Sequence, residues 1–155
     1  MNILLIAVNA KYIHSNPAVF SLKACAGEYG RYVSVLEFTI NQTVSYLLRG
    51  IYKRHPDVAA FSYYIRNHTL LDQLIPGLHK ILPDTDIWAG RPEIFYDTDE
   101  VLQKWKLRGV MTGAGEASFY RLCAAYTSGK QEILPAVLGG AGTKRFLVLL
   151  LPFFH

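Results

Sequence analysis

With 155 residues, the chain is long enough for one globular domain that buries roughly 70% of its unfolded surface. Its 51% hydrophobic and 18% charged residues exclude a disordered chain, and a net charge of +4 without a long basic stripe does not indicate nucleic-acid binding. The longest apolar run, residues 146–154, is shorter than the ~20 residues that span a bilayer, and no signal peptide is recognisable. We therefore expect a cytoplasmic protein without a membrane partner.

Apolar runs of strand type alternate with helical spacings along the first 128 residues. The opening run, residues 2–8, is rich in branched apolar side chains and predicts a strand buried on both faces. The pattern further predicts strands over 32–38, 58–62, 86–90 and 108–112, and helices over 17–29, 43–54, 67 or 69 to 81, 98–105 and 116–127. This alternation predicts a three-layer α/β domain, Rossmann-like or flavodoxin-like and doubly wound, with a five-stranded parallel sheet of order 2-1-3-4-5.

Residues 129–155 break this alternation. The glycine-rich residues 139–142 are followed by the apolar run 146–154, which has no amphipathic pattern. We predict a domain over residues 1–128 and an irregular apolar tail over 129–155. The tail is a native element, an edge strand, a segment that docks on a partner or the truncated end of a longer protein.

Polar and aromatic residues are concentrated in the loops that follow the strands. The carboxyl ends of parallel strands meet at one edge of the sheet, where open α/β sheets bind their ligands. No glycine occurs before Gly27, so the first loop is not a glycine-rich dinucleotide cradle. We expect His14 in that loop either to ligate a metal or to be an exposed loop histidine. The residues that we expect to line a pocket are Asn9, Tyr12, His14, Ser62, Tyr64, Gly90 and Gly113.

Several kinds of site are not supported by the residues present. A response-regulator receiver needs acidic residues after the first strand and an aspartate at the end of the third, where this chain has Asn9 and Ser62. The segment 113–118 imitates a dinucleotide fingerprint, but a tight turn explains it. Cys25 and Cys123 lie in apolar helical patterns, which predicts buried reduced thiols. No catalytic set is recognisable, so we expect no catalysis from the chain alone.

Five segments carry a resemblance to a known family, in the order and on the loops that the family uses: residues 7–16, 36–41, 61–67, 90–97 and 113–116. Over residues 1–128 the chain resembles the N-terminal cobalamin-binding-like domain of bacterial radical S-adenosylmethionine proteins. Cobalamin domains carry an Asp-x-His-x-x-Gly motif after the first strand, whose histidine is the lower ligand of cobalt. The resemblance places His14 at that histidine, with Tyr12 in place of the aspartate and Pro17 in place of the glycine.

The resemblance also covers the next two loops of the family. Cobalamin domains have Ser-x-Leu after the third strand and Gly-Gly after the fourth, small residues that admit the nucleotide tail. Ser62 matches the serine and Tyr64 replaces the leucine, while Gly90 matches the first glycine and Arg91 replaces the second. A long side chain at the second glycine and the missing aspartate beside His14 are departures that bear on corrinoid binding.

The function implied by the resemblance is to hold cobalamin against a radical S-adenosylmethionine barrel for methyl transfer or a related rearrangement. The barrel's Cys-x-x-x-Cys-x-x-Cys motif is not in this sequence, so we expect no iron–sulfur cluster in this chain. Two alternatives remain open. One is a vestigial domain that binds no corrinoid and serves protein interaction or self-association. The other is a flavin- or nucleotide-binding domain that uses Ser15, Asn16 and Tyr63 or Tyr64 at the same edge.

Overall fold

A computed structural model describes residues 1–10, 17–62, 67–91, 98–113 and 115–139 of the chain. Within these ranges, one parallel sheet has the order β2-β1-β3-β4-β5-β6. The strands are β1 (Ile3–Asn9), β2 (Val33–Thr39), β3 (Val58–Ser62), β4 (Asp86–Arg91), β5 (Gly109–Thr112) and β6 (Val137–Gly139). The predicted order 2-1-3-4-5 is confirmed, and β6 extends the sheet beside β5.

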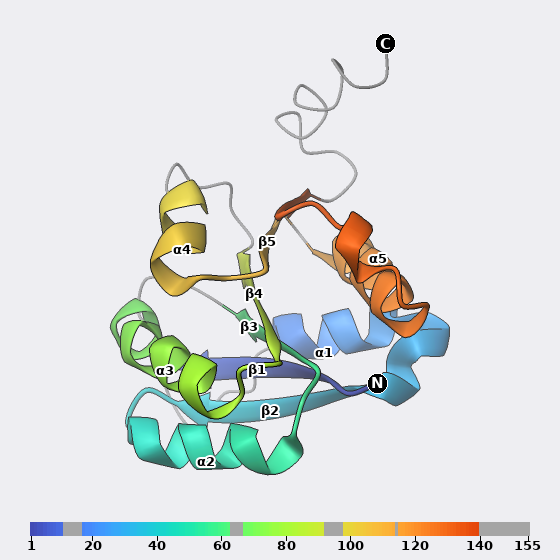
Figure 1. The fold of residues 1–155 in the computed structure, drawn as a ribbon. Helices are drawn as coiled ribbons and strands as arrows, with labels where there is room; N and C mark the ends of the chain where they lie inside the picture. The colour runs from blue at the N-terminus through green and yellow to red at the C-terminus, as the bar shows by residue number, and fades with distance from the viewer. Residues whose placement is uncertain (11–16, 63–66, 92–97, 114, 140–155) are drawn as a thin grey trace.

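Helices cover both faces of this sheet, which confirms the predicted three-layer, flavodoxin-like α/β fold. Figure 1 shows α2, α3 and α4 on one side and α1 and α5 on the other. The helices are α1 (Pro17–Cys25), α2 (Val44–Arg54), α3 (His68–Ile81), α4 (Thr98–Trp105) and α5 (Glu116–Thr127), with 3-10 turns at Gly27–Tyr32 and Gln131–Ile133. The first helix is shorter than predicted, because Gly27 with a φ of 58° begins the 3-10 turn. Pro76 lies inside α3 without ending it.

β1 is buried on both faces, as its continuous apolar run predicts. Residues 3–8 are at most 1% exposed. Alternate residues of β1 enter two separate cores, Leu5 with α1 and α5 and Leu4 with α2, α3 and α4. The strand therefore holds the two helical layers together.

Within the segment 129–155, residues 131–133 form a 3-10 turn and residues 137–139 form β6. Val137 pairs with Val110 and Gly139 with Thr112, so β6 continues the parallel sheet. Residues 140–155 lie outside the described residues. One cysteine prediction also needs correction: Cys123 is buried, and burial raises the pKa of its thiol to about 12, but Cys25 is exposed. Cys25 is the last residue of α1, and its exposed side chain directly precedes the fully buried Ala26.

No helix in the described part of the chain is both long and apolar enough to cross a membrane.

Asp72 of α3 holds α4 in place. It accepts a hydrogen bond of 2.7 Å from Trp105 Nε1 and lies 3.1 Å from Lys104 Nζ. His68 Nδ1 approaches the same carboxylate to 3.2 Å. Partial burial acts to raise the pKa of Asp72, but the hydrogen bonds from Trp105 and Lys104 and the nearby charges outweigh it, so the pKa is lowered. The carboxylate thus fixes the helix that follows β4.

Replacement of Gly109 by alanine tests how tightly β4, β5 and the approach to β6 pack. A Cβ at Gly109 would overlap Cζ3 of Trp88 and lie 2.6 Å from its Cη2 and 2.8 Å from the carbonyl oxygen of Ala136. We expect Gly109→Ala to lower the free energy of unfolding by about 2 kcal/mol, because Trp88 is fully buried and has no room to move. Urea unfolding followed by circular dichroism measures the change. Gly30→Ala, where the nearest atom to the new Cβ lies at 3.9 Å, is the matched control, and equal stability of the two variants would contradict the packing argument.

Candidate functional site

The carboxyl edge of the sheet brings together four of the residues that the sequence singles out. Asn9 and Ser62 are the last residues of β1 and β3. Gly90 is the second-last residue of β4, and Gly113 follows β5 directly. All strands run parallel, so these positions share one edge, which Figure 1 shows around the ends of β1, β3 and β4. After β1 the chain forms β2 on one side of β1 and then β3 on its other side. The carboxyl ends of β1 and β3 are therefore the switch point of the sheet.

Three of the predicted residues, Tyr12, His14 and Tyr64, lie outside the described residues. The roles expected for them remain predictions. Within the described ranges, no group of three or more histidine, cysteine, aspartate or glutamate side chains is arranged to hold a metal ion.

A row of small residues crosses three strands just inside this edge. Ala7 pairs with Ser62, Ser62 with Gly90, and Gly90 with Met111. Strand alternation puts the row on the same face as Leu5 and Trp88, the face that α1 and α5 cover. Side chains therefore project least from this face of the sheet at Ala7, Ser62 and Gly90, which we call the small-residue row.

Packing among the described residues does not require glycine at position 90. A Cβ at this position would meet Cε of Met111 at 3.6 Å and the carbonyl oxygen of Phe61 at 3.8 Å, both ordinary contacts. Its φ is not in the left-handed region. A glycine inside a strand costs about 0.5–1 kcal/mol relative to alanine. The absence of a side chain here thus leaves space on the sheet that the described residues do not use.

Asn67 fixes the two strand ends at the switch point. Its side chain is fully buried, and Nδ2 donates to the carbonyl oxygen of Val8 at 3.3 Å and to that of Ser62 at 2.8 Å. One amide group thereby connects the ends of β1 and β3 and satisfies two carbonyls at the edge. Asn67 immediately precedes α3, in agreement with the prediction that the helix opens at Asn67 or Thr69, but its side chain makes no capping hydrogen bond.

Asn9 makes the corresponding link between β1 and β2. Its Nδ2 donates to Oε2 of Glu37 at 2.8 Å, and its carbonyl oxygen accepts from the backbone N–H of Ile40 at 2.9 Å. Asn9 is half-buried, so the amide is held in one orientation at the edge. The pair gives the β1–β2 side of the site an acidic and an amide group.

The turn from β5 into α5 depends on two glycines and ends in a buried hydroxyl. Gly113 and Gly115 have φ values of 76° and 91°, in a region of backbone conformation that residues other than glycine rarely adopt. Glu116 then begins α5, and Ser21 Oγ of α1 lies 3.4 Å from its Oε1. In the described part of the chain, the fully buried Ser118 Oγ has no hydrogen-bond partner. An unpaired buried hydroxyl costs about 1–3 kcal/mol, which a bound polar group would recover.

The roles of Asn67 and Ser118 were not predicted from the sequence. Asn67 stands five residues after Ser62, where an asparagine before an apolar helical pattern indicates a cap. Ser118 occupies a position of α5 that helical spacing from Leu122 places toward the sheet. A serine at a helix position that faces the sheet was the signal in the sequence for a buried hydroxyl.

Comparison with solved structures shows the same fold in two functional classes. The isolated receiver domain of RcsB from Salmonella enterica serovar Typhimurium superposes with a TM-score of 0.60 at 14% identity, covering 94% of this chain and 98% of that domain. A cobalamin-binding protein from Desulfitobacterium hafniense DCB-2 gives a TM-score of 0.57 at 11% identity, covering 80% of this chain and 58% of that chain. At these identities the likeness shows the fold alone.

A third similar structure is OxsB, described as a cobalamin-dependent S-adenosylmethionine radical enzyme. It superposes with a TM-score of 0.58 at 12% identity and covers 83% of this chain. The chain spans 19% of the length of OxsB.

No curated protein matches the chain. The sequence model of a domain family decides between the two classes of fold relatives. Described as the B12 binding domain, it matches residues 3–123, which span β1 through most of α5 and contain the small-residue row, Asn67 and Ser118. The chain belongs to the B12 binding domain family.

Proposed function

We propose that the domain binds cobalamin at the carboxyl edge of the sheet and holds it for a catalytic partner. The observation that carries the proposal is the small-residue row, because Gly90 leaves room on the sheet that no part of the described chain requires. The row lies at the switch point between β1 and β3, where open α/β sheets bind ligands. Membership in the B12 binding domain family names the ligand class.

The described residues fit such a ligand on three counts. The row offers a shallow surface to a bulky group that comes close to the backbone, as glycine permits. The Asn67 side chain keeps the ends of β1 and β3 together, so this surface is formed before a ligand arrives. Ser118 adds a buried hydroxyl without a partner on the helix that covers the same face. These residues would hold the nucleotide tail, and Asn9 and Gly113 would border it.

The metal in the bound cofactor would supply the reactive centre, suited to methyl transfer or a related rearrangement. By resemblance to cobalamin domains, we propose His14 as the lower ligand of cobalt and Tyr12 and Tyr64 as further residues of the pocket. Tyr12 stands where the family has the aspartate that orients the histidine, so we expect ligation by His14 to be weaker than with that aspartate.

The catalytic partner that we propose is a radical S-adenosylmethionine barrel. The fold likeness to OxsB and the sequence resemblance support this class. The sequence holds two cysteines, Cys25 and Cys123, and the second is buried with a raised thiol pKa. A three-cysteine iron–sulfur site would therefore come from outside residues 1–155.

Titration with hydroxocobalamin tests the proposal directly. We expect a saturable change of the visible spectrum with wild type, and loss of the shift that reports nitrogen ligation in His14→Ala. A shift that survives the mutation would mean that cobalamin binds without His14. Absence of any change at about 50 µM ligand, a concentration that detects micromolar affinity, would contradict corrinoid binding by this chain.

Gly90→Ala separates the needs of the ligand from those of the fold. The new methyl group meets nothing in the described chain closer than 3.6 Å, so we expect unfolding in urea to change by less than about 1 kcal/mol. If the ligand approaches the backbone at Gly90, the same methyl group should weaken hydroxocobalamin binding about tenfold or more. Gly30→Ala, remote on the Gly27–Tyr32 turn, should leave the affinity unchanged. Equal affinities of the two variants would place the ligand elsewhere.

Ser118→Ala should have opposite effects on stability and binding. Removal of an unpaired buried hydroxyl should raise the free energy of unfolding by about 1 kcal/mol without ligand. It should weaken hydroxocobalamin binding about fivefold if the ligand hydrogen-bonds the hydroxyl. Ser128→Ala, at the other end of α5, removes a hydroxyl that already donates to the carbonyl oxygen of Ala124 at 2.7 Å, so it should not stabilise the domain. A loss of stability in Ser118→Ala would contradict the assignment.

A further inference from the structure

A groove of about 780 Å³ runs along the outer side of α2 toward the end of α3. It lies on the side of the sheet opposite the small-residue row, since α2 and α3 belong to the other core. Its lining consists of Ser45, Leu48, Arg49, Tyr52, Lys53 and Ile81. The groove is thus separate from the proposed corrinoid site.

Two glycines allow α2 to pack closely against α3 and β2. A Cβ at Gly77 of α3 would lie 3.1 Å from both Cδ atoms of Leu48, and one at Gly50 would lie 2.9 Å from Cζ of Phe38 in β2. α2 is therefore packed tightly against α3 and the sheet. Its outer surface, in contrast, is covered by no element among the described residues.

The floor of the groove is apolar and exposed. Tyr52 is 47% exposed and Ile81 is 38% exposed. These are two of the six large hydrophobic side chains that are exposed in the described chain. Apolar side chains gathered beside a groove indicate a binding surface more than scattered ones do.

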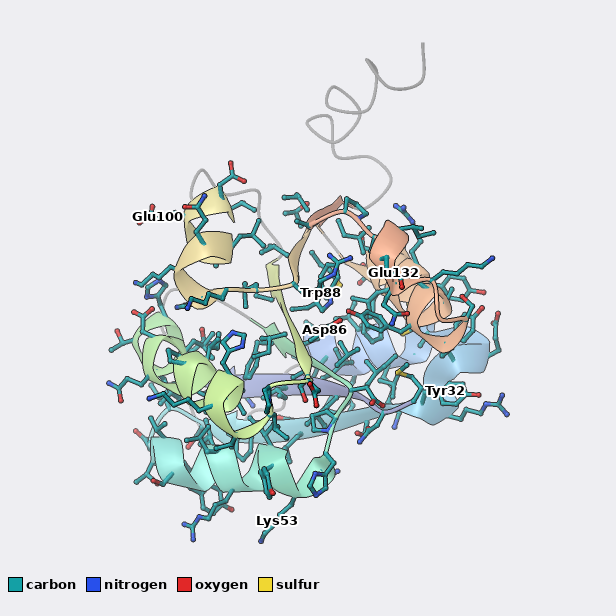
Figure 2. The ribbon with its side chains drawn as sticks, in the orientation of Figure 1. Tyr32, Lys53, Asp86, Trp88, Glu100 and Glu132 are labelled. Atoms are coloured by element: carbon teal, nitrogen blue, oxygen red, sulfur yellow. The ribbon has the colours of Figure 1, made fainter. Side chains whose placement is uncertain are left out.

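The rim of the groove is cationic. Arg49 and Lys53 are both exposed and stand four residues apart, which places them one turn apart on the same face of α2. The helix Val44–Arg54 contains no acidic residue and ends in Lys53 and Arg54. No ion pair within the described ranges involves Arg49 or Lys53. Figure 2 shows Lys53 on the outer side of α2, away from the sheet.

We infer that this groove docks an acidic amphipathic helix of a partner protein. The chemistry of the groove defines the occupant: two carboxylates one helical turn apart would meet Arg49 and Lys53, and an apolar side chain between them would enter against Tyr52 and Ile81. Charge complementarity at the rim would orient the helix, and burial of the apolar side chain would supply affinity.

The shape and charge of the surface favour a protein helix over other macromolecules. A nucleic acid would need a longer row of cations along its phosphates than the single pair at this rim. A membrane surface would need apolar side chains that project, whereas those of the groove line a hollow. A helix in a groove uses both features at once.

Selection of peptides on the full 155-residue chain tests this inference. Random peptides of about 16 residues, roughly four helical turns, are displayed on phage and selected on the immobilised protein. Peptides with two acidic residues at helical spacing around an apolar residue should be enriched. Their affinity, measured by fluorescence anisotropy at about 150 mM salt, should fall about tenfold or more with Arg49→Glu/Lys53→Glu. Ile81→Ser should weaken the same peptides with the charges intact.

Matched controls keep the outcome decisive. Arg121→Glu/Lys130→Glu makes the same change in net charge on exposed positions at α5 and should leave the peptide affinity unchanged. Circular dichroism and Tm establish that each variant is folded. Equal losses in both double variants, no enrichment of acidic peptides, or enriched peptides that bind Arg49→Glu/Lys53→Glu as tightly as wild type would each overturn the inference. If duplex DNA or anionic vesicles bind through Arg49 and Lys53 more tightly than the acidic peptides do, the inference is overturned as well.

Discussion

Burial of β1 on both faces is the constraint on which the rest of the structure depends. Six consecutive residues of the strand are at most 1% exposed, and alternate ones enter the two cores. Such a strand must lie in the middle of the sheet with helices on both sides. Since β2 takes one of its edges and β3 the other, the carboxyl end of β1 is the switch point of the sheet. The position of the candidate site therefore follows from the burial of one apolar segment.

Side-chain amides connect the strand ends at this switch point. Asn67 connects the ends of β1 and β3, and Asn9 connects β1 with Glu37 of β2. Strand ends expose carbonyls and N–H groups that the ladder no longer pairs. The asparagine side chain suits this edge because its amide donates hydrogen bonds without bringing a charge into the partly buried surroundings. A surface that is formed in advance loses less entropy when a ligand binds.

Much of the fold could be predicted from the sequence, because each element is coded locally. The apolar run of β1, the Thr43 cap before α2 and the spacing of α5 each indicate one structure. β6 is three residues long and follows no periodic segment, so pattern alone does not reveal it. The sequence also predicted that Asn9, Ser62, Gly90 and Gly113 lie at one edge of the sheet, while their role in binding stays a prediction. The contacts of Asn67 and the unpaired state of Ser118 depend on residues distant in sequence, which local patterns do not encode.

Gly90 and Gly109 lie on adjacent strands, but the physical reason for a glycine differs between the two positions. At Gly109 the indole of Trp88 and the carbonyl oxygen of Ala136 leave no room for a Cβ, so the fold itself explains the glycine. At Gly90 a methyl group would make ordinary contacts with Met111 and Phe61 and would spare the entropy that glycine loses in a strand. Packing among the described residues gives no reason for glycine there. Close approach of a ligand to the backbone gives one, and this is the physical basis for placing the corrinoid on the small-residue row.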